Sequence, residues 1–579
     1  MFYPRFTAAL FSCGALLSLA GLGHAQTASP PFALHDGDRV VFYGDSITEQ
    51  RLYTTFTENY VVTRFPHLQV SFVHSGWGGD TVHGGGGGPI DDRLTRDVFA
   101  YKPTVMTIML GMNDGGYHAL DQTTFDSYTQ GYTHIVDSVQ STLPGIRLTL
   151  IQPSPYDDVT RAPYFAGGYN GVLIRYGQFV KDLAAKDHFR VADFNTPMNA
   201  MLQKANAADP ATAQKIIPDR VHPSPGGHLV MAEALLKSWN APSVVTDVEL
   251  DAAAKRVVHA ENSQVTRLTS VGKVLSWTQT DGALPFPMPS RDPIVALALK
   301  SSDFVEALDQ ETLRVDGLTA ASSYSITIDG KDAGIVTGKA LMAGINLATL
   351  PTPMTQQAAK VAELTSKHND LHAMRWRVIQ VPLQQDTNDA VRKAVPPLLA
   401  GLDAEEAGIV AQQHAAAQPV PHHYEITPAL PAPTGPNLAL NKPYVGSDPN
   451  HYGYGTNALT DGSWEGGSDH TFATGDSDTF PKTVTVDLGA ASSLAAVRVG
   501  VPSFGSTETI EVSTSADGKV FTPVGSYTFT QGQEERYLYR FAPVLARYVR
   551  LTYPDHYSAE IGYSNKFSFT TEVEAYAPG

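Results

Sequence analysis

Four short segments carry side chains of the kinds that acyl-transfer chemistry uses. Gly-Asp-Ser at residues 44–46 follows the apolar run 40–43, and the segments 75–81, 111–114 and 219–223 come later in the chain. The last of these holds an aspartate three positions before a histidine. A serine hydroxyl is a weak nucleophile at neutral pH unless a neighbouring base takes its proton, and histidine commonly serves as that base. These residues therefore predict nucleophilic serine chemistry.

The predicted nucleophile is Ser46, with His222 as its base and Asp219 beside the base. Because Asp219 lies three positions before His222, a single loop can place its carboxylate on the second ring nitrogen. That hydrogen bond fixes the tautomer of the ring and stabilises the imidazolium that forms during attack. We expect two-step acyl transfer, in which Ser46 attacks an ester carbonyl, His222 passes the proton to the leaving alkoxide, and water clears the acyl-enzyme.

Together the four segments resemble the SGNH/GDSL hydrolase family, which is named for its Ser, Gly, Asn and His. The resemblance implies an esterase whose oxyanion hole consists of the backbone amides of Ser46 and Gly79 and the side-chain amide of Asn113. Glycine suits position 79 because a backbone amide must approach the substrate without a Cβ in the way. We expect no cofactor for catalysis. A second Gly-Asp-Ser, at residues 475–477, has no later Asp-x-x-His to support it.

A glycine run beside these segments suggests a rival hydrolase fold. His83 and the run at 84–88 resemble the oxyanion loop of α/β-hydrolase lipases. That fold needs a Gly-x-Ser-x-Gly elbow, and the chain contains none. We therefore interpret the run as a mobile loop beside the active site.

The elements around the four segments alternate between short apolar strands and amphipathic helices from residue 31 to residue 242. This alternation predicts a parallel sheet with helices on both faces, and the resemblance implies a flavodoxin-like α/β domain over 31–242. Because ligand sites of such sheets lie at the carboxyl ends of the strands, Ser46 and His222 are expected at one sheet edge. The expected strands are 39–43, 69–74, 105–110 and 147–151, and the expected helices include 124–142 and 169–186.

Composition and the first residues indicate an exported, multidomain protein. The chain has 579 residues, and its formal net charge of −17 disfavours nucleic acid and anionic membrane surfaces as partners. Residues 1–25 read as a secretory signal peptide, and the single cysteine, Cys13, lies inside it. No other stretch approaches the ~20 apolar residues of a membrane span. We expect a secreted or periplasmic protein with no transmembrane span and, once mature, no disulfide.

Beyond the hydrolase segment the pattern changes. Residues 244–350 read as short strands separated by turn signals and predict a small β-sandwich. Residues 351–417 have helical periodicity, and these helices could form a bundle or dock on the hydrolase domain. His368 and His372 lie one helical turn apart, as metal ligands can, but without a third ligand nearby we interpret them as part of a helix face. The Pro-rich segment 418–436 predicts a semi-rigid linker.

Residues 437–579 carry motifs of a second family. Asn-Leu-Ala-Leu-Asn-Lys-Pro opens the segment, Leu-Thr-Asp-Gly-Ser-Trp follows, and later stretches alternate as half-buried strands. These motifs resemble a discoidin-like (coagulation-factor type C) β-sandwich, a jelly roll common as a carbohydrate-binding domain. The resemblance implies a glycan ligand at the loops of one end and a structural Ca²⁺ held by carboxylates. The candidate sugar-binding residues are Tyr452, Tyr454, Trp464 and His470, and the candidate Ca²⁺ ligands are Asp461 and Glu574.

The two resemblances together predict a secreted serine esterase that removes O-acetyl or other short acyl groups from a polysaccharide and is targeted by a C-terminal sugar-binding domain. Two alternatives stay open. One is a general carboxylesterase or lipase anchored to a glycan surface. The other is a non-catalytic glycan-binding protein with a decayed hydrolase domain. The intact set of Ser46, Gly79, Asn113, Asp219 and His222 argues against decay.

Overall fold

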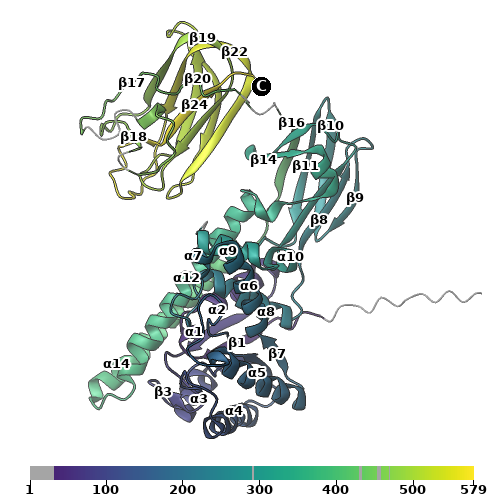
Figure 1. Cartoon of the computed structure of the whole chain (residues 1–579), viewed down its shortest axis with the longest axis vertical. Coiled ribbons are helices and arrows are strands. Elements are labelled where there is room, and N and C mark those ends of the chain that lie inside the picture. The colour runs from purple at the N-terminus through teal and green to yellow at the C-terminus, as the bar shows by residue number, and fades with distance from the viewer. Residues whose placement is uncertain are drawn as a thin grey trace, which may run out of the picture.

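The computed structural model describes residues 31–289, 292–429, 433, 435–452, 458–467 and 470–578. The predicted signal peptide with Cys13, and also Tyr454, lie outside the described residues. The described chain forms an N-terminal α/β domain, a middle β-sandwich with a long helical extension, and a C-terminal β-sandwich (Figure 1). None of the described helices is both long and apolar enough to cross a membrane.

The N-terminal domain is built on a five-stranded parallel sheet in the order β2-β1-β5-β6-β7. The inner strand β1, which lies between β2 and β5, has no exposed surface from Val40 to Tyr43, because helices cover both faces of the sheet. This order confirms the predicted flavodoxin-like arrangement, in which the second strand lies outside the first. The strands are β1 Arg39–Gly44, β2 Ser71–Gly76, β5 Val105–Met109, β6 Arg147–Gln152 and β7 Arg190–Asp193. The main covering helices are α2 Leu52–Arg64, α3 Ile90–Asp97, α4 Gln122–Thr142, α5 Gly168–Lys186, α6 Asn195–Ala208 and α8 Pro225–Ser238.

The middle β-sandwich follows directly after α8. One of its sheets has the strand order β15-β12-β8-β9 and the other β10-β11-β16-β13-β14. The strands of the first sheet are β8 Val244–Asp251, β9 Arg256–Glu261, β12 Gln310–Asp316 and β15 Ile345–Asn346. Those of the second are β10 Ser263–Val271, β11 Val274–Asp281, β13 Ser323–Ile328, β14 Lys331–Thr337 and β16 His422–Pro428.

The segment 244–350 forms most of the predicted β-sandwich, but three α-helices among its described residues interrupt the strands, one of them α11 Gly338–Ala343. α9 Pro293–Ser301 and α10 Phe304–Leu308 pack into the core of the N-terminal domain. The side chain of Asp292 caps α9 by accepting a hydrogen bond from the Ile294 amide at 2.8 Å. A short apolar run such as that of α9 fits strand and helix patterns equally well.

The prediction that residues 418–436 form a linker is wrong for residues 422–428. Residues His422–Pro428 form β16, which pairs antiparallel with both β11 and β13. Tyr424 is buried and stacks on Trp277, with ring centres 5.0 Å apart. The prolines on both sides of this strand masked its period-two pattern.

A helical arm, residues 353–416, leaves the middle sandwich and returns to it. It consists of α12 Pro353–Ala373, the π-helical segment η3 Met374–Gln380, α13 Val381–Leu383 and α14 Asp389–Ala416. Figure 1 shows α12 and α14 running side by side along the N-terminal domain. Of the two arrangements left open by the sequence, docking on the hydrolase domain is therefore the observed one.

Buried charges fix the arm to α2. Glu58 of α2 contacts His368 Nε2 at 2.6 Å and accepts a hydrogen bond from Gln413 Nε2 at 2.9 Å. Burial alone would lower the pKa of His368, but the carboxylates of Glu58 and Glu406 raise it to about 10. His372 Nδ1 lies 3.2 Å from the carboxylate of Glu406. The His368/His372 pair thus bridges carboxylates, and the described residues contain no His/Cys/Asp/Glu group suited to a metal ion.

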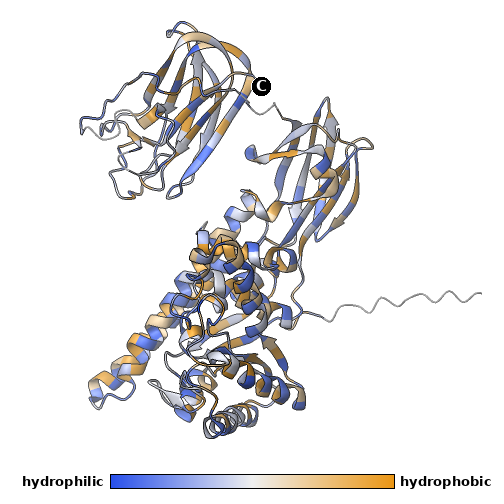
Figure 2. Cartoon of the chain, in the orientation of Figure 1, coloured by the Kyte–Doolittle hydropathy of each residue, from blue (hydrophilic) through white to orange (hydrophobic). Residues whose placement is uncertain are grey.

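The C-terminal β-sandwich has its own apolar core and stands apart from the N-terminal domain (Figure 1). Its main sheet has the strand order β17-β19-β22-β20-β21, with β24 paired to β19. Hydrophobic and hydrophilic residues mix along its strands (Figure 2), as in sheets with one buried face. The strands are β17 Tyr444–Gly446, β18 Phe472–Ala473, β19 Lys482–Val501, β20 Thr509–Ser515, β21 Thr522–Thr528, β22 Glu535–Tyr553, β23 Phe569–Thr570 and β24 Glu572–Tyr576.

Candidate active site

Ser46 opens a short helix, α1 Ser46–Glu49, at the carboxyl end of β1. Asp45 is the N-cap of that helix, and its carboxylate accepts a hydrogen bond from the Ile47 amide at 3.0 Å. A Cβ at Gly44 would lie 2.7 Å from the Met109 carbonyl oxygen, so only glycine lets the strand end pack this closely against β5. The strand-to-helix turn therefore presents a partly exposed Ser46 hydroxyl at the sheet edge.

His222 and Asp219 meet Ser46 in a continuous hydrogen-bonded line. His222 Nε2 lies 2.8 Å from Ser46 Oγ, and His222 Nδ1 lies 2.6 Å from Asp219 Oδ2. The second carboxylate oxygen of Asp219 accepts from the amides of Val221 and His222 at 2.9 and 2.7 Å. Burial alone would raise the pKa of Asp219, but the hydrogen bonds from His222 and Val221 hold it below its usual range. An ionised Asp219 can orient the imidazole so that Nε2 accepts the serine proton.

The loop that carries His222 is anchored by residues that the motifs did not reveal. Arg220 has a φ of +72°, which is uncommon for a residue with a side chain. Its carbonyl accepts from the Asp157 amide at 2.9 Å, and its guanidinium donates to the Asp157 carbonyl at 3.1 Å. This paired contact holds the left-handed turn between Asp219 and His222. No local sequence signal connects residue 157 to residue 220.

Gly79, a predicted oxyanion donor, lies in a turn beside Ser46. The active-site turn, residues 77–80, closes with a hydrogen bond from the Asp80 amide to the Trp77 carbonyl at 3.1 Å. Gly79 has a φ of +78° and open space where a Cβ would stand, and a Cβ at Gly78 would lie 4.0 Å from Ser46 Cβ. The turn therefore borders the serine with an exposed glycine amide.

Asn113 is held between two partners. Its Nδ2 donates to the Asp80 carbonyl at 3.0 Å, and its Oδ1 accepts from the Tyr117 hydroxyl at 2.9 Å. These contacts fix which end of the amide faces the turn, as a donor to an oxyanion requires. Sequence reasoning missed Tyr117, which lies four positions after Asn113 at a φ of +61°.

Buried charged side chains hold the active-site turn in place. Arg93 has no exposed surface; its Nε donates to Asp80 Oδ2 at 2.7 Å, its Nη2 donates to the Ser75 carbonyl at 2.9 Å, and it also pairs with Asp97. Burial raises the pKa of Asp45 and of Asp114 to about 7. These buried polar groups hold the backbone around the serine rather than face the substrate.

The glycine run 84–88 lies beside this turn as a small hairpin, β3 Gly84–Gly85 and β4 Gly88–Pro89. A Cβ at Gly87 would lie 2.6 Å from the Trp77 ring, and a Cβ at Gly85 would lie 2.8 Å from Asp80 Oδ1. The glycines thus make room for the active-site turn. The predicted mobility of this loop stays a prediction.

Known proteins share both terminal domains. Residues 42–230 match the GDSL-like Lipase/Acylhydrolase family, and residues 458–551 match the NedA-like, galactose-binding domain. The N-terminal domain is a GDSL-like hydrolase domain. The C-terminal domain is of the galactose-binding type, so both family resemblances found in the sequence are confirmed.

Two relatives extend this comparison. An acetylxylan esterase from Geobacillus stearothermophilus is 25% identical over 222 residues, and the match covers 35% of this chain and 93% of that protein. The solved structure of a gut microbial diltiazem-metabolizing enzyme matches 70% of this chain and 100% of its own, with 26% identity and a TM-score of 0.60. This second match covers more of the chain than the GDSL-like domain does. Together with the two family matches, these relatives support an ester hydrolase domain joined to a domain of the galactose-binding type.

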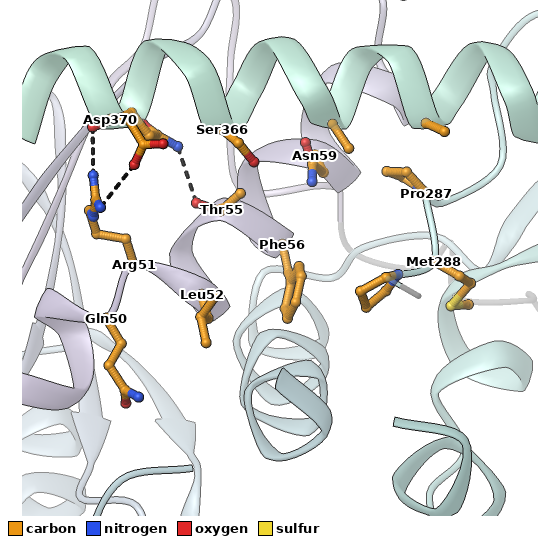
Figure 3. Close-up of a pocket in the computed structure, with 14 residues that line it drawn as sticks. Gln50, Arg51, Leu52, Thr55, Phe56, Asn59, Pro287, Met288, Ser366 and Asp370 are labelled. Carbon is orange, nitrogen blue, oxygen red and sulfur yellow. Dashed lines mark hydrogen bonds and ion pairs between the residues drawn. The ribbon is translucent and has the colours of Figure 1, made fainter. Parts of the chain in front are cut away.

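A cavity of about 410 Å³ lies between the GDSL-like domain and the helical arm (Figure 3). Arg51 crosses it to donate to the Asn369 carbonyl at 2.7 Å and to Asp370 Oδ1 at 3.0 Å. Gln50, at one end, contacts His228 Nε2 at 3.0 Å and donates to the Pro223 carbonyl at 3.3 Å. The cavity lining includes neither Ser46 nor His222.

The predicted sugar-binding residues of the galactose-binding domain have different environments. Tyr452 is 60% exposed, and its hydroxyl donates to Asp476 at 2.9 Å. His470 is also exposed. Trp464 packs on Gly500, where a Cβ would lie 2.6 Å from its ring, and its Nε1 donates to Glu574 at 3.3 Å. Trp464 therefore has a packing role, and Tyr454 lies outside the described residues.

The predicted Ca²⁺ ligands do not fit that role as a pair. Glu574 already accepts from Trp464, from Arg498 Nη1 at 2.8 Å and from the Tyr576 hydroxyl at 2.5 Å. The buried acid near Asp461 is instead Glu572, whose Oε2 accepts from the Gly462 amide at 3.1 Å. Burial, with Asp461 and Glu574 nearby, raises the pKa of Glu572 to about 9.

Proposed function

We propose that this chain is a serine esterase in which Ser46 is the nucleophile, His222 the general base and Asp219 the residue that orients the base. The observation that carries the proposal is the hydrogen-bonded line from Asp219 through His222 to Ser46 Oγ. The family match of residues 42–230 supports ester hydrolysis as the reaction class.

Each step uses groups around this line. Ser46 Oγ attacks the carbonyl carbon as its proton passes to His222 Nε2, and the imidazolium then gives that proton to the departing alkoxide. Water, deprotonated by the same imidazole, attacks the acyl carbon. The bond to Ser46 Oγ then breaks, Oγ takes the proton back from the imidazolium, and the acid is released. The amides of Ser46 and Gly79 and Nδ2 of Asn113 would stabilise the oxyanion. Each such donor contributes roughly 10²–10³ in rate.

The proposed substrate is an acetyl or other short acyl ester on a polysaccharide, and the predicted signal peptide supports action outside the cytoplasm. The relative named acetylxylan esterase and the galactose-binding domain both support a carbohydrate ester. The relative that metabolizes diltiazem supports the alternative, a carboxylesterase that accepts small-molecule esters.

Two measurements test these proposals. A fluorophosphonate probe should label the wild-type protein and not Ser46→Ala, since the probe reacts with an activated serine; equal labelling of both would overturn the assignment. Acetate release from acetylated xylan is then compared with hydrolysis of nitrophenyl acetate and of longer-chain nitrophenyl esters. Faster turnover of the longer-chain esters would favour the general carboxylesterase.

A further inference from the structure

The π-helical segment η3 of the helical arm places an arginine beside the candidate active site. The guanidinium carbon of Arg377 lies 3.5 Å from the centre of the Trp77 ring. Its Nη1 donates to Glu49 Oε1 at 2.5 Å. Stacking of a guanidinium on an indole adds a cation–π attraction to the ion pair. One side chain of the arm thus joins two segments of the GDSL-like domain.

Both partners of Arg377 border Ser46. Glu49 ends the helix α1 that Ser46 begins, and Trp77 opens the active-site turn that carries Gly79. A Cβ at Gly78 would lie 2.6 Å from Glu49 Oε2 and 4.0 Å from Ser46 Cβ. The carboxylate of Glu49 therefore lies beside the turn that carries Gly79, a proposed oxyanion donor.

Trp77 is half-buried and has other neighbours besides Arg377. The glycine hairpin packs on its ring, and the guanidinium carbon of Arg93 lies 5.2 Å from the ring centre. Trp376, the residue before Arg377, meets it edge-on at 5.7 Å and donates to Asp97 at 2.7 Å. Arg377 is the contact that completes this packing and also reaches the serine helix.

We propose that Arg377 is a positioning residue of the esterase site, an inference that rests on the proposed function. It holds the active-site turn against α1, so that the Gly79 amide meets the oxyanion. It also neutralises Glu49, whose unpaired carboxylate would repel the oxyanion.

Substitutions separate the two parts of this role. Arg377→Ala should lower kcat on nitrophenyl acetate by about tenfold to a hundredfold, as displacement of about 1 Å can do, with little change in KM. Arg377→Lys keeps the charge without the planar stacking, so its kcat should lie between those of wild type and Arg377→Ala. Adding Glu49→Gln to Arg377→Ala should restore part of kcat, because it removes the unpaired carboxylate.

Arg375 provides the matched control. It lies on the same segment, but its Nε donates to Asp403 Oδ1 of α14 at 2.7 Å, within the arm. Arg375→Ala should keep wild-type kcat. An equal loss of kcat in Arg375→Ala and Arg377→Ala would mean that kcat depends only on the stability of the arm, and would overturn the proposal. A raised KM with unchanged kcat in Arg377→Ala would overturn it as well.

Hydrogen exchange tests the placement without using activity. Peptides that cover residues 76–81 should exchange faster in Arg377→Ala than in wild type and Arg375→Ala, and unchanged exchange would overturn the proposal. If wild type shows neither esterase activity nor probe labelling, the proposed function fails, while the exchange result still decides whether Arg377 holds the turn.

Discussion

The tripeptide Gly-Asp-Ser occurs once in each terminal domain, and its two copies have different partners. Asp45 is 1% exposed and caps α1, and Ser46 Oγ lies against a histidine that is itself held by Asp219. Asp476 and Ser477 are exposed. The hydroxyl and the amide of Ser477 both donate to Asp448 Oδ2, at 2.9 and 3.2 Å.

The partner of the second serine is a poor base. Asp448 Oδ2 also lies 2.7 Å from Lys482 Nζ. Burial alone would raise the pKa of Asp448, but Lys482 and Ser477 hold it below its usual range. A carboxylate whose pKa is lowered has little tendency to take a hydroxyl proton. The same tripeptide therefore has different chemistry in the two domains, because the side chains around it differ.

Removal of each serine hydroxyl in turn should give the largest difference between the two tripeptides. Ser46→Ala should abolish ester turnover, because no other group forms the acyl-enzyme. Ser477→Ala should leave turnover on nitrophenyl acetate unchanged. Active-site titration and steady-state rates of both purified variants measure the contrast. Near-wild-type turnover in Ser46→Ala would end the assignment.

The next largest effect is expected from the charge behind the base. Asp219→Asn should lower kcat by up to about 10⁴, because an amide loses the charge that stabilises the imidazolium. Asp209→Asn is the control, since Asp209 is an exposed N-cap of the short helix α7 Pro210–Ala213. Equal kcat in the two variants would contradict the role of Asp219.

A smaller loss is expected at the oxyanion. Asn113→Ala should lower kcat by roughly 10²–10³ with little change in KM, because the donor meets the oxyanion more strongly than the ground-state carbonyl. Tyr117→Phe removes only the hydroxyl that holds Asn113 Oδ1 and should lower kcat less. If KM rises in Asn113→Ala while kcat stays constant, Asn113 binds the substrate instead.

The motif residues could be placed from sequence because the carboxyl ends of parallel strands share one edge, which brings Ser46, Gly79 and Asn113 together. Tyr117, Arg93 and Arg377 could not, because their contacts depend on packing between segments with no common pattern. The arm lies more than 300 residues from Glu49 in the chain, with a separation of 328 positions between Arg377 and Glu49. The strand β16 was missed for a local reason, its flanking prolines.

The helical arm is attached to the GDSL-like domain through ionisable side chains. The pKa of His368 is raised to about 10 by Glu58 and Glu406 against burial. Its stabilising contribution is therefore complete below the ordinary histidine pKa of ~6.5 and is lost as pH rises through about 10. The unfolding temperature of wild type should fall more between pH 6.5 and 10 than that of His368→Gln. Parallel curves would contradict the linkage.

The smallest effect on chemistry is expected from separating the two copies of the tripeptide. A cut between residues 429 and 437 leaves β16 in the middle sandwich and splits no described strand or helix. The catalytic piece should match the full chain on nitrophenyl acetate, because the groups around Ser46 all precede the cut. On an insoluble acetylated glycan it should be slower, since it loses the local concentration that a second binding site provides.

The isolated C-terminal piece should be retained on a polysaccharide column, and Tyr452→Ala should weaken retention more than Val520→Ala, a change at a residue that is 72% exposed. Loss of activity on the small ester after the cut would show that the galactose-binding domain supports the active site directly.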